Sequence, residues 1–259
     1  MKTFISIMLL LVVANLSFAD DFRYYDVEII VTENLGDTGR NAENWPLQVN
    51  LVQEEKTVEL GQPVTAEWLP DDVNLKASYK LLNSSHYHLN DLVEKITESK
   101  TKRVILHTAW RQPGLDKKTS LPIHFKYLVP AAPVIDDETN PNIINQREEE
   151  AETATLPIQN SPSILEGILR VTLARYLHLE SELTLQSQLP ELIKTDNPFE
   201  DLDNENIRSE LEKQGVIHFK QKRHRIRSNE LHYLDHPVLG ILIKITKYEL
   251  PEKVTQLKK

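Results

Sequence analysis

The strongest constraint on the fold is the alternation of apolar and polar residues between Leu169 and Leu185. Most residues in one register of this stretch are leucine or valine, while the other register holds side chains such as Arg170 and Glu182. A period of two is typical of a strand with one buried face. The stretch is much longer than a usual strand of about five or six residues. It therefore predicts either one long bent strand or a hairpin that turns near Glu180–Glu182.

Other stretches have the β-branched, alternating composition of strands. They are residues 24–32, 103–111, 122–128 and 238–248, together with 216–225 and 228–234, which we expect to pair as a hairpin. Asn83, Ser84 and Ser85 are good N-cap residues before an apolar repeat, so a helix is predicted over residues 85–99. A second, short helix is predicted over 204–214. These patterns favour an α+β fold, largely an antiparallel β-sheet with one or two packed helices.

Residues 131–163 differ in composition from the rest of the chain. They contain four prolines and seven acidic residues but a single basic one, Arg147. Such a segment buries too little apolar surface to offset the entropy lost on ordering. We interpret it as a disordered acidic linker that interrupts one α+β domain spanning residues 20–259.

The first nineteen residues have the pattern of a cleavable signal peptide. Lys2 precedes an apolar run from Phe4 to Leu16, and small residues, Ser17 and Ala19, follow it. The alternative is a membrane anchor, but the run is shorter than the roughly 20 apolar residues that a spanning helix needs. No cysteine follows the run, so a lipid-anchored product is excluded. We expect a periplasmic mature chain with no membrane span.

Composition excludes several classes of function. The formal charge is −9, which disfavours a general nucleic-acid binder. The chain has no cysteine, which removes thiol catalysis, iron–sulfur clusters and disulfides, and it has no GxGxxG or GxxxxGK[ST] loop for a nucleotide. No cofactor is therefore expected.

Two candidate chemical sites are weak. His232, Asp235 and His236 are metal-ligand types, but a strand followed by a turn would point them in different directions, and no second cluster supplies further ligands. In this interpretation Asp235 instead accepts hydrogen bonds from turn amides. Hydrolytic sets built from Ser228, Glu230 and His232, or from Asp235 and His107, lack a glycine-rich elbow. We expect no metal and no catalytic residue.

A binding surface is the stronger candidate. Arg223, Arg225 and Arg227 lie in a dense run of basic residues within an acidic protein, and such a run attracts anions locally. The polar register of the long alternating stretch adds Arg170, Tyr176 and His178, with which the three arginines form the predicted ligand surface. The alternative is that the charges only protect a strand edge against aggregation.

Four segments resemble a known family. They are YYDVEIIV at 24–31, HTAWRQP at 107–113, GILRVTLARYLHLESEL at 167–183 and RSNELHYLDHPVLGILIKI at 227–245, of which LHYLDHP is the most specific. They resemble the CsiV family of periplasmic peptidoglycan-binding proteins of Gram-negative bacteria. The resemblance implies a non-enzymatic protein that binds peptidoglycan and assists cell-wall synthesis with an outer-membrane lipoprotein activator and its penicillin-binding synthase. It supplies no ligand residues.

Two other classes of function stay open at this point. A periplasmic scaffold would act on the synthesis machinery through protein contacts alone. A hydrolase, which is the weaker alternative, would release soluble muropeptides. A binding module, by contrast, should sediment with purified sacculi on its own.

The signal-peptide interpretation predicts where the mature chain begins. Exported protein should start at Asp20, because the small residues before it fit a signal-peptidase site. Intact-mass measurement of the exported protein tests this, and a mass that includes residues 1–19 would contradict it.

Overall fold

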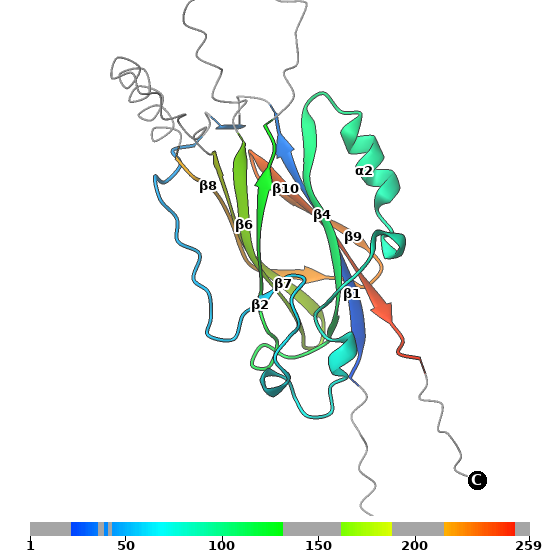
Figure 1. Ribbon diagram of the computed structural model, residues 1–259. Coiled ribbons are helices and arrows are strands. Elements are labelled where there is room, and N and C mark those ends of the chain that lie inside the picture. The colour runs from blue at the N-terminus through cyan, green and yellow to red at the C-terminus, as the bar shows by residue number, and fades with distance from the viewer. Residues whose placement is uncertain (1–21, 36–38, 41–42, 132–161, 188–214, 252–259) are drawn as a thin grey trace, which may run out of the picture.

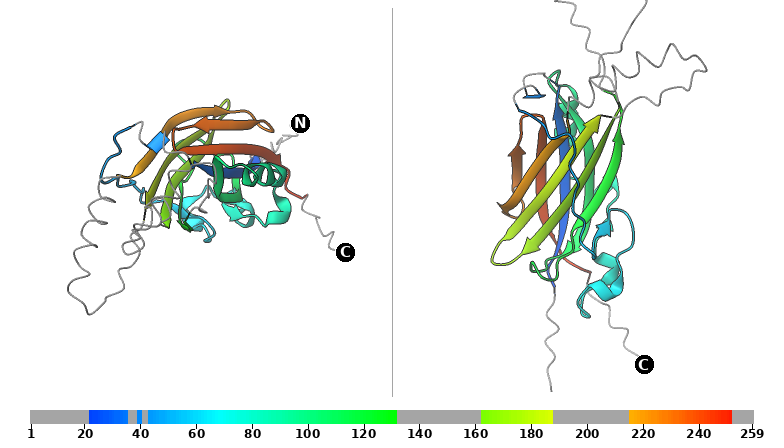
Figure 2. Two further views of the ribbon diagram at one scale, coloured as in Figure 1. Left: turned by 90° about the horizontal axis from the view of Figure 1, so that it is seen from above. Right: turned by 90° about the vertical axis from the view of Figure 1, so that its left-hand side faces the viewer.

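The computed structural model describes residues 22–35, 39–40, 43–131, 162–187 and 215–251. Within these residues the strands form two five-stranded sheets, A and B, which face each other (Figures 1 and 2). Most strand pairs are antiparallel, and a short α-helix lies on the outside of sheet A. The predicted α+β class with largely antiparallel sheet is therefore confirmed. The division of the strands between two sheets was not predicted.

The strand order in sheet A is β3-β4-β1-β10-β9. Its strands are β1 (Tyr24–Asn34), β3 (Lys80–Leu81), β4 (Lys102–Pro113), β9 (Leu231–Asp235) and β10 (Leu239–Tyr248). The order in sheet B is β2-β5-β6-β7-β8, where only β2 runs parallel to its neighbour. Its strands are β2 (Val58–Glu59), β5 (Ile123–Val129), β6 (Ser163–Leu173), β7 (Leu177–Ser187) and β8 (Ile217–Ile226).

The first predicted strand is confirmed as β1, the centre of sheet A. Its Ile29 pairs with Thr108 of β4 on one side and with Ile243 of β10 on the other. Ile29, Ile30 and Val31 are all fully buried, so both faces of this strand are covered. That explains why the alternation of the segment gives way to a continuous Ile-Ile-Val run.

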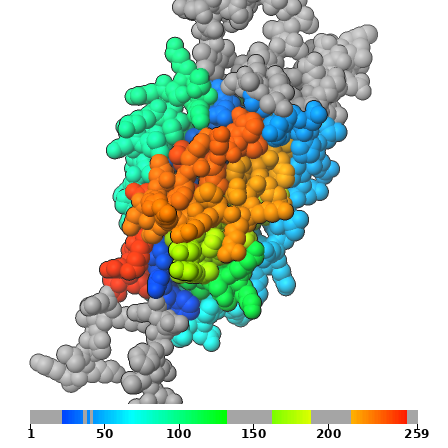
Figure 3. Space-filling model, turned by 180° about the vertical axis from the view of Figure 1, so that it is seen from behind, coloured from blue at the N-terminus to red at the C-terminus, as the bar shows by residue number. Residues whose placement is uncertain are grey.

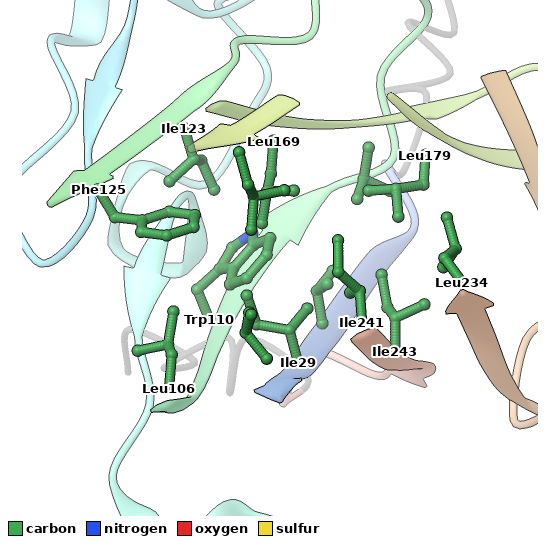
Figure 4. Close-up of a cluster of buried hydrophobic side chains, with 14 of the residues drawn as sticks. Ile29, Leu106, Trp110, Ile123, Phe125, Leu169, Leu179, Leu234, Ile241 and Ile243 are labelled. Carbon is green, nitrogen blue, oxygen red and sulfur yellow. The ribbon is translucent and has the colours of Figure 1, made fainter. Parts of the chain in front are cut away.

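The hydrophobic core lies between the two sheets (Figure 4). Trp110, Ile29 and Ile241 project from sheet A toward Leu169 and Leu179 of sheet B. In β6 and β7 the odd-numbered residues face this core and the even-numbered ones face outward. Sheet-on-sheet packing of this kind requires that alternation, which the sequence shows most clearly in these two strands.

The helix is shorter than predicted. Helix α2 spans Asn90–Thr97 and follows a 3₁₀ turn at Ser84–His86, whereas the sequence predicted one helix over 85–99. Other short 3₁₀ helices cover Ala66–Trp68 and Leu75–Ala77. The carboxylate of Glu28 accepts hydrogen bonds from the backbone N–H groups of His88 and Leu89, at 2.7 and 3.0 Å. Because the side chain of Glu28 binds these two N–H groups, they do not donate to carbonyls of a preceding helical turn, and the helix begins only after them.

The long alternating stretch is a hairpin, but its turn lies at residues 174–176 rather than near 180–182. Leu173 pairs with Leu177, so three residues separate the two strands. Because the loop contains an odd number of residues, the odd-numbered residues face the core in both strands. The period of two therefore continues through the turn, which hides the turn from a reading of hydrophobicity.

The predicted hairpin of residues 216–225 with 228–234 is wrong. Strand β8 pairs with β7 in sheet B, whereas β9 pairs with β10 in sheet A. The residues between them cross from one sheet to the other, with Asn229 at φ 65° and its N–H bonded to the carbonyl of Ile245. The true hairpin of this region is β9–β10. Closeness in the sequence suggested pairing, but β8 and β9 are the edge strands of two different sheets.

The predicted linker lies almost entirely outside the described residues, as does the helix predicted over 204–214. Ser163, at its end, is the first residue of β6 and pairs with Val129 of β5. Strands from before and after this segment occur in both sheets. The single-domain organisation and the disorder of the linker stay predictions, as does the signal peptide.

The core is closely packed beside Gly167 of β6. A Cβ added there would lie 2.4 Å from Cζ of Phe125, a buried residue directly opposite on β5. We expect Gly167→Ala to lower the free energy of unfolding by about 1–3 kcal/mol, because the ring must move within a packed interior. Urea denaturation measures this. In a Phe125→Leu background the same substitution should cost less, and equal costs in both backgrounds would contradict the argument.

Candidate functional site

The outer face of sheet B is covered by charged side chains in alternating arrangement. They come from the even-numbered positions of β5, β6, β7 and the first half of β8, where the odd-numbered positions face the core. The main contributors are His124, Glu166, Arg170, Glu180, Glu182, His218 and Lys220. This face differs from that of sheet A, part of which α2 covers.

Most of these charges are paired with each other. His124 lies between Glu59 and Glu166, at 2.8 and 2.9 Å, and Glu182 accepts from His218 and Lys220 at 2.9 and 2.8 Å. Burial by itself would raise the pKa of Glu182, but the hydrogen bonds from Lys220 and His218 outweigh it and lower that pKa. The middle of the sheet is therefore a fixed ionic network rather than a set of available charges.

Arg170, one of the predicted ligand residues, belongs to this network. Its side chain is only 11% exposed and forms ion pairs with Glu54 and, at 3.9 Å, with Glu180. Its Nε is buried without a hydrogen-bond partner. Arg170 is therefore a largely buried part of the ionic network and is not available to a ligand at the surface.

A cavity of about 340 Å³ opens beside Arg170. Lys117, Lys220 and Lys222 line it together with acidic residues, among them Glu54 and Glu180. Sequence patterns did not indicate this hollow, because Lys117 and Glu54 come from loops that are distant in the chain from β6, β7 and β8. The cavity is bordered by the ionic network on one side and by residues of the edge strand β8 on the other.

A β-bulge shapes the edge strand β8. Leu179 pairs with His224, but Ser181 pairs with Gln221, so Lys222 and Arg223 both lie opposite Glu180. Such a bulge redirects side chains locally. Here Arg223 faces outward, and its guanidinium lies 3.4 Å from Nε2 of His178.

Next to this bulge, Arg225 stacks on Tyr176. The guanidinium carbon lies 3.5 Å from the centroid of the ring, and that of Arg175 lies at 5.4 Å. Tyr176 is 37% exposed in the β6–β7 turn, and His178 is paired directly with Arg225. Cation–π stacking of this kind holds a guanidinium in place while its N–H donors stay available.

The protonation of His178 follows from its surroundings. Partial burial and the positive charge of Arg223 lower the pKa of His178 below its ordinary value. The ring is therefore neutral at pH 7, and it does not add to the repulsion among the arginines. We call Tyr176, His178, Arg223 and Arg225 the cationic cluster.

Arg227, the remaining predicted ligand residue, does not belong to this cluster. It lies in the connection to β9, where its guanidinium is 3.6 Å from Glu230 and its backbone N–H donates to His232. The structure thus brings together four of the six predicted residues. Lys222, which belongs to the predicted basic run, lies beside them in the bulge. Arg175 lies beside them in the turn; it was not among the predicted ligand residues because it falls in the apolar register of the alternating stretch.

The residues of the weak candidate metal site do not point toward a common centre. His232 faces inward, with its ring 5.7 Å from that of His224, while Asp235 accepts from the hydroxyl of Tyr233 at 2.7 Å. The turn amides of Val238 and Leu239 are bound by Nδ1 of His236, and not by Asp235 as predicted. Within the described residues, no group of three or more ligand-type side chains is placed to hold a metal ion.

The hydrolytic candidates do not come together either. The hydroxyl of Ser228 donates to the carbonyl of Ile245 at 3.3 Å, and Nε2 of His107 lies 2.8 Å from Glu28 under the start of α2. Nε2 of His232 accepts from the backbone N–H of Arg227 at 3.0 Å, and Asp235 accepts from Tyr233 rather than from His107, so neither set presents a nucleophile with a base.

One of the comparisons with known proteins identifies a family. A family model described as "Peptidoglycan-binding protein, CsiV" matches residues 2–248. No curated protein and no solved structure matches the chain. No helix in the part of the chain that the structure describes has both the length and the apolar character needed to cross a membrane. Since the family model covers nearly the whole sequence, the chain belongs to the CsiV family of peptidoglycan-binding proteins.

Proposed function

We propose that this protein binds peptidoglycan through the cationic cluster at the β7–β8 edge of sheet B. The observation that carries the proposal is the convergence of Tyr176, His178, Arg223 and Arg225 on one exposed surface. These residues come from a turn and two strands, so no single sequence pattern requires them to meet.

The chemistry of the cluster suits the stem peptides of peptidoglycan, which carry free carboxylates. Arg223 and Arg225 can each donate two hydrogen bonds to a carboxylate, and Tyr176 fixes the orientation of Arg225. Because the pairs form at an exposed surface, each contributes only about 0–1 kcal/mol. Affinity for the polymer would therefore come from several pairs acting together along many stem peptides.

Protection of a strand edge explains the charges on β8 only in part. An edge needs repelling charges to discourage pairing with another chain. It does not need an arginine stacked on a tyrosine of the neighbouring turn, or a bulge that directs a second arginine toward His178. These features fit an organised anion-binding surface better.

We further propose that the protein is exported to the periplasm, acts without catalysis and assists cell-wall assembly. A lipoprotein activator in the outer membrane and its penicillin-binding synthase are the partners that this role would involve. The second candidate function is a scaffold that touches this machinery without binding glycan. The organised cationic cluster favours direct binding.

The double substitution Arg223→Ser/Arg225→Ser tests the surface. We expect association with purified sacculi to fall by about threefold to tenfold, because two screened charge pairs are lost per site. The binding that remains should depend less on salt. Sedimentation of the mature protein with sacculi over a range of salt concentrations measures both effects.

A charge-matched control is Lys95→Ser/Lys100→Ser, which removes two exposed positive charges in and just after α2. It should bind sacculi as the parent does. Both variants should keep the melting temperature of the parent. If the arginine variant is folded and binds with the same affinity and salt response as the parent, the cationic cluster is not the ligand surface. If the parent sediments only with added partner protein, the scaffold alternative is correct.

A further inference from the structure

The segment LHYLDHP, on which the resemblance noted in the sequence depends most, does not contribute to the cationic cluster. It forms β9 and the turn into β10 at the edge of sheet A. Leu234 points into the core, and His232 faces the same way, toward His224. Leu231, Tyr233 and Asp235 point outward, so they are the strand residues of the segment whose side chains are presented on the outer face.

The ring of Tyr233 lies against the sheet rather than standing away from it. A Cβ added at Gly240 of β10 would come within 2.9 Å of Cε2 and 3.0 Å of the hydroxyl of Tyr233. The ring thus occupies the space above a glycine in the adjacent strand. Aromatic cover of a glycine is a known device that stabilises sheets.

Two polar groups fix the ring at its hydroxyl end. The hydroxyl donates to Oδ1 of Asp235 at 2.7 Å, and Nζ of Lys102 donates to it at 3.3 Å. The same ammonium lies 5.3 Å from the ring centroid. Burial and the hydrogen bond to Asp235 raise the pKa of Tyr233 to about 12, so the hydroxyl stays protonated at any physiological pH.

The ring remains exposed although it is fixed. Tyr233 is 43% exposed, and Leu231, two residues earlier on the same face, is 48% exposed. The comparable ring over Gly167, that of Phe125, is 2% exposed in the core. An aromatic ring can therefore cover a glycine without being exposed to solvent, so this role does not explain the exposure of Tyr233. An ordered aromatic ring that faces solvent is suited to binding a ligand.

We propose that Tyr233 is a stacking platform for a sugar ring of the glycan strand of peptidoglycan, flanked by Lys102 and Asp235. The inference rests on the proposed function, since it concerns another part of the same polymer. The apolar C–H face of a pyranose packs on an aromatic ring. Lys102 and Asp235 lie at the end of the ring where they can donate to and accept from sugar hydroxyls and acetamido groups.

Charge and size favour a sugar over a protein or a stem peptide. Lys102 and Asp235 carry opposite charges that meet at one hydroxyl, so the patch suits a neutral group, whereas the cationic cluster suits anions. The exposed apolar part consists of two side chains, Leu231 and Tyr233. A stable protein interface buries roughly 800 Å² on each partner, which is far more than these two residues offer.

The two surfaces lie on neighbouring edges of the molecule. Strand β8 is the edge of sheet B and β9 is the edge of sheet A, and the rings of His224 and His232 meet between them. Figure 3 shows β8 in amber beside β9 in orange on one side of the molecule. A polymer along this side can reach both surfaces, with glycan on one and peptide on the other.

Binding of chitooligosaccharides, neutral oligomers of N-acetylglucosamine, tests the platform. We expect Tyr233→Leu to lower the affinity by about tenfold, because stacking is lost, while Tyr233→Phe keeps it within about threefold. Binding should be insensitive to salt. Calorimetric titration of the mature protein measures affinity, and thermal unfolding checks that leucine still covers Gly240. Leu128→Ala, an exposed apolar residue of sheet B, serves as the control and should bind as the parent does.

The outcomes separate this inference from the proposed function. If the parent sediments with sacculi but does not bind the oligosaccharides, or if Tyr233→Leu binds them as the parent does, the platform is wrong and the proposed function stands. Failure of the parent to bind sacculi would contradict the proposed function. Oligosaccharide binding that Arg223→Ser/Arg225→Ser abolishes would place the sugar on the cationic cluster and also overturn the platform.

Discussion

The side chains packed between sheets A and B hold this chain together without any disulfide, since the sequence contains no cysteine. Trp110, Ile29 and Leu169 are among the fully buried residues of this layer. Burial of apolar area is the dominant favourable contribution to folding. Both proposed binding surfaces depend on this packing, because a side chain that faces outward is held in place by neighbours in the strand that face inward.

This dependence explains which parts of the fold could be predicted. Alternation identified β1, β4, β5 and β10, because their inward residues must be apolar to fill the core. Alternation could not locate the turn at 174–176, since a three-residue loop preserves the parity of the buried face. It also could not show that β8 and β9 belong to different sheets, because a period records which face is buried and not which strand lies beside it.

The candidate site was predictable to a similar extent. Tyr176, His178, Arg223 and Arg225 were selected as outward or cationic residues, and the pairing of β7 with β8 brings them together. Arg170 met the same criterion, but loop residue Glu54 binds it and removes it from the exposed surface. A single sequence does not reveal such a contact between distant segments. For that reason the ionic network and the cavity beside it emerged only from the structure.

The two outer faces use aromatic residues in different ways, and this difference supports a division of labour. On sheet B, Tyr176 is covered by Arg225, so its ring serves to position a cation. On sheet A, Tyr233 is fixed from the side by Asp235 and from beneath by the backbone at Gly240, which leaves a face of the ring for the proposed sugar contact. Peptidoglycan combines charged peptides with neutral sugars. A protein that presents one surface for each on adjacent strand edges can recognise the polymer by that combination, which neither an anionic protein nor a neutral polysaccharide offers.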